Sequence, residues 1–246
     1  MYFRIPGSDL RVLGAMHLVP ADRPHPPRFV ATAYKWANLI ISEHDDRGFE
    51  ALMTANVRKP LDELLSPNAW QMLQSRWPTD KFPTPNDCHP WAAWLFGSSF
   101  HLDGRVGVEA YLKTRAAQDG KPIEFLELLS DLVHPLVALG DTALCAGIEW
   151  AMANIPQVRQ DFRAMYKAWV TCDGSEVSRL LHIFQARGHQ THEVLFQQRN
   201  HVWAPLVREL INSSEKTLLT VGAGHLFGPD NLFDCVGVVP EPLRAA

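Results

Sequence analysis

Two segments of the chain carry the same pattern, an apolar run followed by Gly-x-x-His. Residues 12–17 end at His17, and residues 218–225 end at His225. A glycine at the carboxyl end of a strand lets the backbone turn sharply, so the next side chains point into the crevice above the sheet. Ligands bind in this crevice in open α/β sheets. Two imidazoles delivered there could hold one metal ion, whereas each histidine alone could equally cap or pack.

Acidic residues close two further apolar segments. Glu43 follows residues 39–42, and Glu127 follows residues 121–126. If these segments are neighbouring parallel strands, the carboxylates come near the two histidines, where each could be a metal ligand or a general base acting on a metal-bound water. The alternative for each glutamate is a solvated side chain or a cap of the next helix. His44 is excluded, because successive residues of a strand point to opposite faces.

A polar pair, Arg199 and Asn200, interrupts a helical pattern between Phe196 and Trp203. An arginine there could clamp a substrate carboxylate or stabilise an oxyanion. It could also be a surface residue whose aliphatic stem lies on its neighbours. Because Phe196 and Trp203 lie three and four residues away, the spacing predicts that Arg199 shares their buried face and pairs with a strand-end glutamate.

The pair His189 and His192 stands three residues apart at the start of a predicted helix. The segment is neither His-Glu-x-x-His nor its inverse, so we expect a solvated first turn outside the site. The sequence has no phosphate-binding glycine loop, no Gly-x-Ser-x-Gly elbow and no dinucleotide fingerprint. Nucleotide chemistry and serine-hydrolase chemistry therefore lack support.

The elements that must position these residues lie towards the two ends of the chain. Residues 2–5 and 10–15 form a predicted hairpin around a Pro-Gly-Ser-Asp turn. A predicted helix at 27–36 and a buried strand at 39–41 follow, which suggests a βαβ unit. Near the other end, predicted strands cover residues 217–221 and 236–239.

Between the two ends, the sequence is predicted to be mainly helical, apart from the strand at 121–126. Breaks are expected at Pro135, Gly140 and Pro156. The predicted helices include residues 61–65, 67–76, 90–100, 106–119, 173–187, 190–212 and 229–235. We therefore expect an α+β fold in a single domain over 1–246. Its small mixed sheet is formed by 1–45 and 215–246, and a large helical insert covers 46–214.

Composition limits the class of protein. The chain has 246 residues, with 23 Lys and Arg against 27 Asp and Glu, which gives a formal net charge of −4. This balance excludes a strongly basic nucleic-acid binder. No apolar run reaches the length of about 18–20 residues that a membrane helix needs, and the N-terminus lacks a signal-peptide pattern. The four cysteines are scattered, so we expect a reduced, cytoplasmic protein without a zinc ribbon.

Several motifs, in this order along the chain, resemble the TraB/GumN family, which includes PrgY-type proteins and is related to the Tiki metalloproteases. The most specific is Gly-Ala-Gly-His-Leu-x-Gly at 222–228. Others are Leu-Gly-x-x-His at 13–17, an apolar strand ending in Glu-x-Asp at 39–45 and the Arg-Asn pair at 199–200. Further similar segments are the Pro-Trp helix start at 90–91, the helix at 107–112, the Gly-Lys-Pro turn at 120–122 and Leu-Glu at 126–127.

The resemblance implies a TraB/Tiki/ChaN-like fold with a site built on the two Gly-x-x-His motifs. Transferred to this sequence, it implies His17, Glu43 and His225 as metal ligands. In the same way, it implies supporting catalytic roles for the polar residues Glu127, Arg199 and Asn200.

The function implied by the resemblance is a metal-dependent hydrolase that acts on a peptide or a small amide-like substrate. Two imidazoles and a carboxylate suit Zn, Mn or Co, and the sequence does not choose among them. Glu127 is then expected to shuttle protons and Arg199 to stabilise an oxyanion. The alternative is a non-catalytic regulatory protein of the same fold that binds a peptide, a metal or haem. No nucleic-acid or membrane partner is expected.

Overall fold

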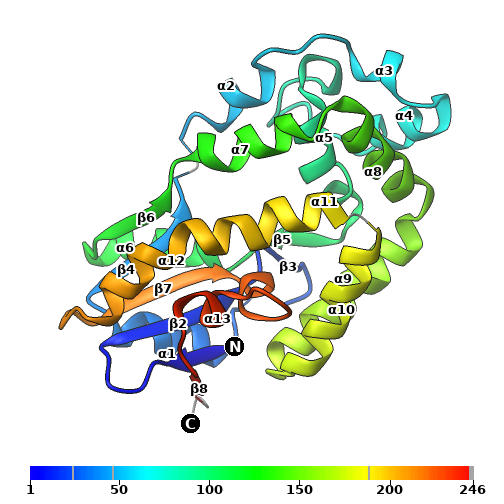
Figure 1. Cartoon of the computed structure of the whole chain (residues 1–246). Helices are drawn as coiled ribbons and strands as arrows, with labels where there is room; N and C mark the ends of the chain where they lie inside the picture. The colour runs from blue at the N-terminus through cyan, green and yellow to red at the C-terminus, as the bar shows by residue number, and fades with distance from the viewer. Residues whose placement is uncertain (24, 46, 188, 244–246) are drawn as a thin grey trace. The chain divides into compact units, whose positions relative to one another are not determined.

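The computed structural model describes residues 1–23, 25–45, 47–187 and 189–243, without the side chain of His189. The chain divides into two compact units. The first, here called the sheet unit, comprises Met1–Asp45, Arg105–Leu128 and Ala164–Ala246, and the second, here called the helical unit, comprises Asp46–Gly104 and Leu129–Arg163. Figure 1 shows the order of the elements along the chain. That the whole chain forms one domain stays a prediction.

The sheet unit contains a mixed sheet with the strand order β6-β4-β7-β2-β1-β8. The strands β6, β4, β7 and β2 are parallel neighbours, whereas β1 runs antiparallel to both β2 and β8. A separate two-stranded sheet pairs β3 with β5. The strands are β1 Tyr2–Arg4, β2 Leu10–Ala15, β3 Leu18–Pro20, β4 Leu39–His44, β5 Gly104–Val106, β6 Ile123–Glu127, β7 Thr217–Gly222 and β8 Glu241–Pro242. The predicted α+β class, with a mixed sheet that both chain ends build, is confirmed.

Helices follow and separate these strands. In the sheet unit they are α1 Arg28–Trp36, α6 Val108–Asp119, α10 Gly174–Arg187, α11 His189–His192, α12 Gln198–Ile211 and α13 Leu232–Val236. In the helical unit they are α2 Phe49–Thr54, α3 Leu61–Leu64, α4 Pro67–Gln74, α5 Pro90–Phe96, α7 Leu129–Ala138 and α8 Asp141–Ala153. Helix α9, Ile155–Val170, contributes residues to both units.

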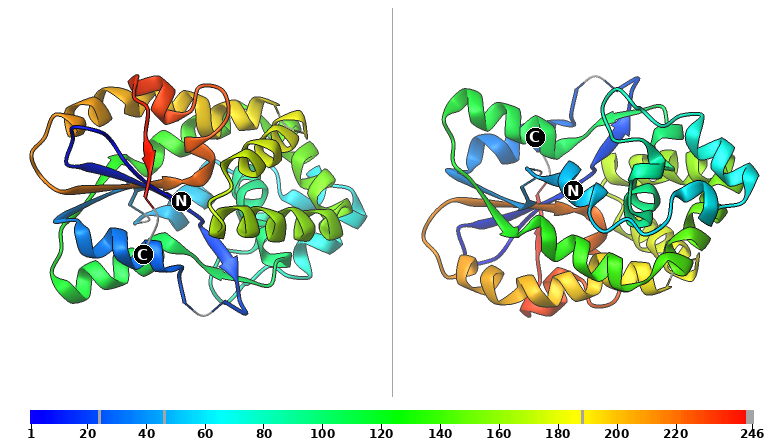
Figure 2. Two further views of the ribbon diagram at one scale, coloured as in Figure 1. Left: turned by 90° about the horizontal axis from the view of Figure 1, so that it is seen from below. Right: turned by 90° about the horizontal axis from the view of Figure 1, so that it is seen from above.

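Both faces of the mixed sheet are covered by helices. Ile40 of β4 packs in one apolar cluster with residues of α1 and α6, whereas Leu39 and Ile41 pack in another with residues of α12 and α13. Figure 2 shows α1 and α6 on one side of the sheet and α12 and α13 on the other. Burial on both faces explains why β4 reads as a continuous apolar run in the sequence.

The helical unit has its own aromatic core. Its ring contacts include Phe49 with Trp91 at 5.5 Å, Phe49 with Phe96 at 5.1 Å and Trp77 with Phe100 at 5.1 Å between centroids.

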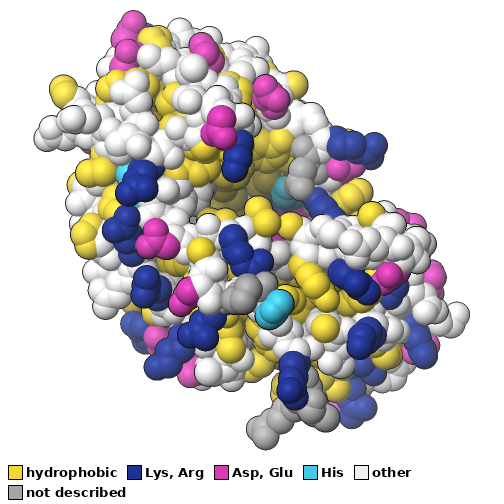
Figure 3. Space-filling view, turned by 180° about the vertical axis from the view of Figure 1, so that it is seen from behind, with side chains coloured by type: hydrophobic (Ala, Val, Ile, Leu, Met, Phe, Trp, Pro, Cys, Tyr) yellow, Lys and Arg dark blue, Asp and Glu magenta, His cyan; other side chains and the backbone are white. Residues whose placement is uncertain are grey.

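Within the described residues, no single helix is long and apolar enough to cross a membrane, although α7 and α8, bent by 94°, together reach the required length and composition. On the face of the molecule in Figure 3, basic side chains lie among acidic and apolar ones.

Two local predictions were wrong. Pro135 lies inside α7 and does not end it, because its neighbours Leu132, Val133 and Leu136 are buried and hold the helix despite the missing N–H. Residues 236–239 are not a strand. The side chain of Asn231 caps α13 at its start, and Gly237, with φ of 76°, ends it, so the edge strand β8 begins only afterwards.

Candidate functional site

Neighbouring parallel strands end at one edge of the sheet, and four predicted site residues lie there. Glu43 belongs to β4, and Glu127 is the last residue of β6. His17 follows β2 by two residues, and His225 lies in the 3₁₀ turn Ala223–Leu226 that follows β7. The shared direction of the strands therefore brings together residues that are up to 208 positions apart (17 to 225) in the sequence.

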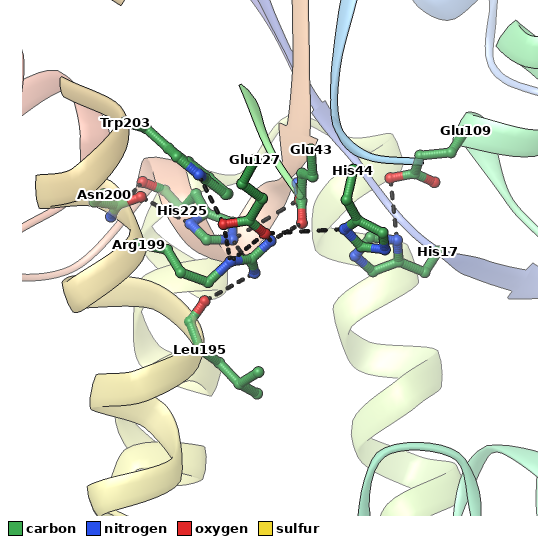
Figure 4. Close-up of polar contacts among 11 residues, drawn as sticks. His17, Glu43, His44, Glu109, Glu127, Leu195, Arg199, Asn200, Trp203 and His225 are labelled. Carbon is green, nitrogen blue, oxygen red and sulfur yellow. Dashed lines mark hydrogen bonds and ion pairs between the residues drawn. The ribbon is translucent and has the colours of Figure 1, made fainter. Parts of the chain in front are cut away.

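Arg199 of α12 stands in the middle of this cluster (Figure 4). Its Nη2 donates to Oε2 of Glu43 at 2.6 Å and to Oε1 of Glu127 at 2.7 Å, and its Nε donates to Glu127 at 3.0 Å. Its Nη1 donates to the carbonyl oxygen of Leu195 at 3.0 Å and lies 3.3 Å from Nε2 of His225. The three charged side chains are at most 9% exposed, so the predicted pairing of a buried arginine with the strand-end glutamates is confirmed.

A π-helical turn, Glu193–Gln197, precedes α12 and sets the direction of its first residues. The N–H of Gln198 bonds back to the carbonyl of Glu193, five residues earlier. Arg199 and Asn200 are adjacent, and both are buried, at 8% and 1% exposure. Single π turns widen a helix locally and occur often at functional sites. Nothing in the continuous helical pattern of residues 190–212 indicated this turn.

Asn200 fixes the imidazole of His225. Its Nδ2 donates to the main-chain oxygens of His225 at 3.3 Å and of Asp230 at 2.9 Å. The Oδ1 of Asn200 therefore accepts, and Nδ1–H of His225 donates to it at 2.7 Å. Burial lowers the pKa of His225 to about 3, so the ring is neutral and its Nε2 carries a lone pair. This Nε2 faces the cluster, 3.8 Å from Oε1 of Glu43.

Aromatic rings enclose His225, which the sequence did not predict. The ring of Trp203 lies 4.6 Å from the imidazole, and the ring of Phe196 lies 5.0 Å from it. A Cβ at Gly224 would come within 2.4 Å of the Phe196 ring. The second glycine of Gly-Ala-Gly-His therefore makes room for Phe196. Trp203 also donates from Nε1 to Oε2 of Glu127 at 2.9 Å.

His17 approaches the cluster from the solvent-exposed side, since its side chain is 63% exposed. Its Nδ1 forms an ion pair at 3.2 Å with Oε1 of Glu109, a residue of α6 that we did not single out from the sequence. The carboxylate of Glu109 raises the pKa of His17 to about 9.

Gly222, the first glycine of the second motif, marks the point where the side chains meet. A Cβ placed on it would lie 3.3 Å from Oε1 of Glu43, 3.4 Å from Nε2 of His17 and 3.6 Å from Cδ2 of His225. Its N–H also donates to Oε1 of Glu43 at 2.5 Å. The absence of a side chain at Gly222 therefore leaves a space that all three predicted ligands border.

The two central carboxylates have pKa values that shift in opposite directions. Burial disfavours the charged form of Glu43. The charge of Arg199 and that of the protonated His17 imidazole outweigh this and, with the Gly222 N–H, hold its pKa well below the usual range. For Glu127, burial is the larger effect and raises the pKa despite Arg199. Two carboxyl groups whose pKa values differ in this way are suited to different roles, one permanently anionic and one able to carry a proton.

Two expectations about other histidines were wrong. His44 was excluded as facing away, but its Nδ1 lies 4.0 Å from Oε1 of Glu127 because β6 pairs with β4 at this position. His192 was expected to be solvated, but it is 9% exposed and packs 4.9 Å from the ring of Phe196 in the adjoining π turn. The side chain of His189, expected at the surface, lies outside the described residues.

The cluster does not form a ready-made metal site. Over residues 1–23, 25–45, 47–187 and 189–243, no group of three or more His, Cys, Asp or Glu side chains is arranged so that it could hold a metal ion. The guanidinium of Arg199 bridges Glu43 and Glu127 instead. The roles predicted for His17 and His225 therefore stay predictions, although the structure brings both side chains to the space beside Gly222.

Comparison with known families gives one result. A family model described as TraB/PrgY/gumN family matches residues 3–236, which is nearly the whole chain. Searches of curated proteins and of solved structures found no match.

Proposed function

The chain belongs to the TraB/PrgY/gumN family, and from this premise we propose that it is a metal-dependent hydrolase whose substrate is a peptide or a small amide. One observation carries the proposal. Oε1 of Glu43 and Nε2 of His17 lie 3.3 Å and 3.4 Å from the Cβ position of Gly222, and the ring carbon Cδ2 of His225, which is bonded to Nε2, lies 3.6 Å from it.

The donor set fits a divalent ion in its chemistry. Two imidazoles and one carboxylate suit Zn, Mn or Co. In each imidazole the nitrogen away from the cluster has a polar partner, Glu109 for His17 and Asn200 for His225. Metal-binding histidines usually have such a second partner. The chemistry that a bound divalent ion supplies is polarisation of a carbonyl and acidification of a water molecule.

The charged residues of the site have different roles in the proposed reaction. Glu43 stays anionic at neutral pH, whereas the raised pKa of Glu127 suits it to accept a proton and return it to a leaving amine. Each of the five N–H groups of Arg199 has a protein acceptor within reach. Arg199 therefore stabilises an oxyanion only if it releases one of these contacts, and its first role is to hold the two carboxylates in place. Nε2 of His225 likewise binds an ion only after the Nη1 contact of Arg199 is released.

Metal content tests the proposal directly. We expect the purified protein, after incubation with Zn²⁺, Mn²⁺ or Co²⁺ and removal of free ions, to retain about one ion per chain by elemental analysis. His17→Ala and His225→Ala should each lose most of it, because each removes one of three ligands. His182→Ala is the matched control, since His182 is exposed on α10. Wild-type protein that retains no ion with any of these metals would refute the proposal.

The pH dependence of metal binding gives a second prediction. With a pKa of about 9, His17 is protonated at neutral pH and must lose a proton to bind an ion, whereas His225 is already neutral. The apparent association constant for Co²⁺ should therefore rise roughly tenfold per pH unit from about pH 6 to about pH 8. Titrations at several pH values measure this slope, and His182→Ala should keep it. A flat profile would show that His17 is not a ligand.

A second candidate function has its own support. The bridging position of Arg199, and the lack of a ready metal-binding arrangement in the described part of the chain, favour a binding protein of the same fold that holds a peptide or haem without turnover. A haem protein would show Soret absorbance and no stoichiometric divalent ion. A peptide-binding protein would show neither signal.

A further inference from the structure

We propose that Glu109 is a positioning residue that holds the imidazole of His17 with Nε2 directed to the space beside Gly222. The inference rests on the proposed function, since the direction of the ring matters only if this nitrogen acts there. Neither the motif spacing nor the pairing of the strands indicated a role for Glu109.

The start of α6 first fixes the backbone of His17. The N–H of Gly107 donates to the carbonyl oxygen of His17 at 2.8 Å, and the N–H of Val108 donates to that of Met16 at 3.0 Å. A Cβ on Gly107 would lie 1.8 Å from the Met16 oxygen, so only glycine permits this approach. These hydrogen bonds therefore attach the segment after β2 to the start of α6 at His17, the residue whose side chain must be oriented.

Glu109 then holds the ring itself. The side chain of His17 is 63% exposed, so packing does little to fix its orientation, whereas that of Glu109 is 15% exposed. Oε1 of Glu109 is buried and makes no hydrogen bond within the described part of the chain, so its 3.2 Å ion pair with Nδ1 of His17 is what compensates its burial. Figure 4 shows the contact between Glu109 and Nδ1 of His17. With Nδ1 held by Glu109, Nε2 at the other side of the ring comes within 3.4 Å of the Cβ position of Gly222.

A partner on one imidazole nitrogen decides which way the other nitrogen points. In metal sites, loss of such a partner typically weakens metal binding by about 10–100-fold. His225 has the same arrangement with Asn200 at its Nδ1. Glu109 and Asn200 therefore act as equivalent supports for the two histidines of the Gly-x-x-His motifs, one as a carboxylate and one as an amide.

Two substitutions of Glu109 distinguish a positioning role from a purely electrostatic role. Glu109→Gln keeps the length of the side chain and an oxygen beside Nδ1, but removes the charge. Glu109→Asp keeps the charge but withdraws the oxygen from Nδ1 by about one methylene. The probe is Co²⁺ alone, whose visible absorption spectrum reports the geometry of its ligands. Glu124→Gln on β6 is the matched control for loss of an exposed carboxylate, and circular dichroism verifies the fold of each variant.

Positioning predicts that Glu109→Gln and Glu124→Gln keep the wild-type Co²⁺ spectrum, and that Glu109→Asp changes the spectrum and weakens binding by about 10–100-fold. The reverse order, with Asp like wild type and Gln altered, would overturn the inference in favour of a purely electrostatic role. Equal spectra and affinities in all variants would also overturn it while leaving the proposed function intact. Wild-type protein that does not bind Co²⁺ would refute both together.

Discussion

Replacing Arg199 by alanine is expected to lower the free energy of unfolding by about 3–5 kcal/mol. The guanidinium pairs with Glu43 at 2.6 Å and with Glu127 at 2.7 Å, and both carboxylates are at most 4% exposed. Without Arg199, two negative charges remain close together in the interior with no cation between them. Loss of one partner of a buried ion pair is costly mainly for this reason, whatever the pair itself contributes.

Chemical denaturation followed by circular dichroism measures this change. Arg179→Ala is the control, because Arg179 pairs with Glu176 at the surface of α10 and its side chain is 56% exposed. That substitution should cost no more than about 1 kcal/mol. Adding Glu127→Gln to Arg199→Ala should recover part of the lost free energy of unfolding, since one of the two unpaired carboxylate charges is removed. A loss below about 1 kcal/mol for Arg199→Ala would mean that water or a proton readily compensates the carboxylates, and that Arg199 does not hold the cluster together.

The position of Arg199 also illustrates what sequence can reveal. Its spacing from Phe196 and Trp203 predicted a buried face, and the glutamates at two strand ends offered the only nearby negative charges that the pattern suggested. The π turn at Glu193–Gln197 could not be predicted, because a widened turn has the same residue preferences as the helix around it. The sequence thus indicated which residues pair but not how α12 turns toward them.

The parallel strands were the most predictable part of the fold. Apolar runs that end in glycine or glutamate predicted β2, β4, β6 and β7, and their common direction brings His17 and His225 together. Short terminal elements were less predictable. Residues 236–239 are apolar enough for a strand, but Gly237 adopts a left-handed conformation that ends α13 there. Such a choice depends on local backbone geometry that composition does not show.

Contacts between elements far apart in sequence were missed for a different reason. Glu109 lies 92 positions (17 to 109) from His17, and nothing in its own segment distinguishes it from a surface acid of a helix. His44 follows Glu43 and was excluded by strand alternation, but the register of β4 against β6 brings it to 4.0 Å from Glu127. Such pairs become visible only when the register of neighbouring elements is known.

Changing Glu127 to glutamine should lower kcat by about 10²–10⁴-fold while metal content stays at the wild-type level. Burial raises the pKa of Glu127, which brings a carboxyl group closer to the range where it exchanges protons at neutral pH. Glutamine keeps the shape and an oxygen that accepts from Arg199 or Trp203, but it cannot carry the proton. Because Glu127 is not among the three residues that border Gly222, its loss should not release the ion.

Hydrolysis of a fluorescent peptide library and elemental analysis of the same samples test the two halves of this prediction. Glu124→Gln, on the same strand but exposed, should keep both turnover and metal. If Glu127→Gln turns over substrate as fast as wild type, Glu127 only pairs with Arg199 and Trp203, and the proton must move through another group. If wild-type protein binds its ion and is folded but cleaves no peptide, the protein binds a ligand without turnover. The two histidines then belong to a binding site, and the cluster around Arg199 stabilises that site. Turnover that falls together with metal content would instead mean that the charge of Glu127 is needed to hold Arg199 in place, and with it the ligands Glu43 and His225 that Arg199 contacts.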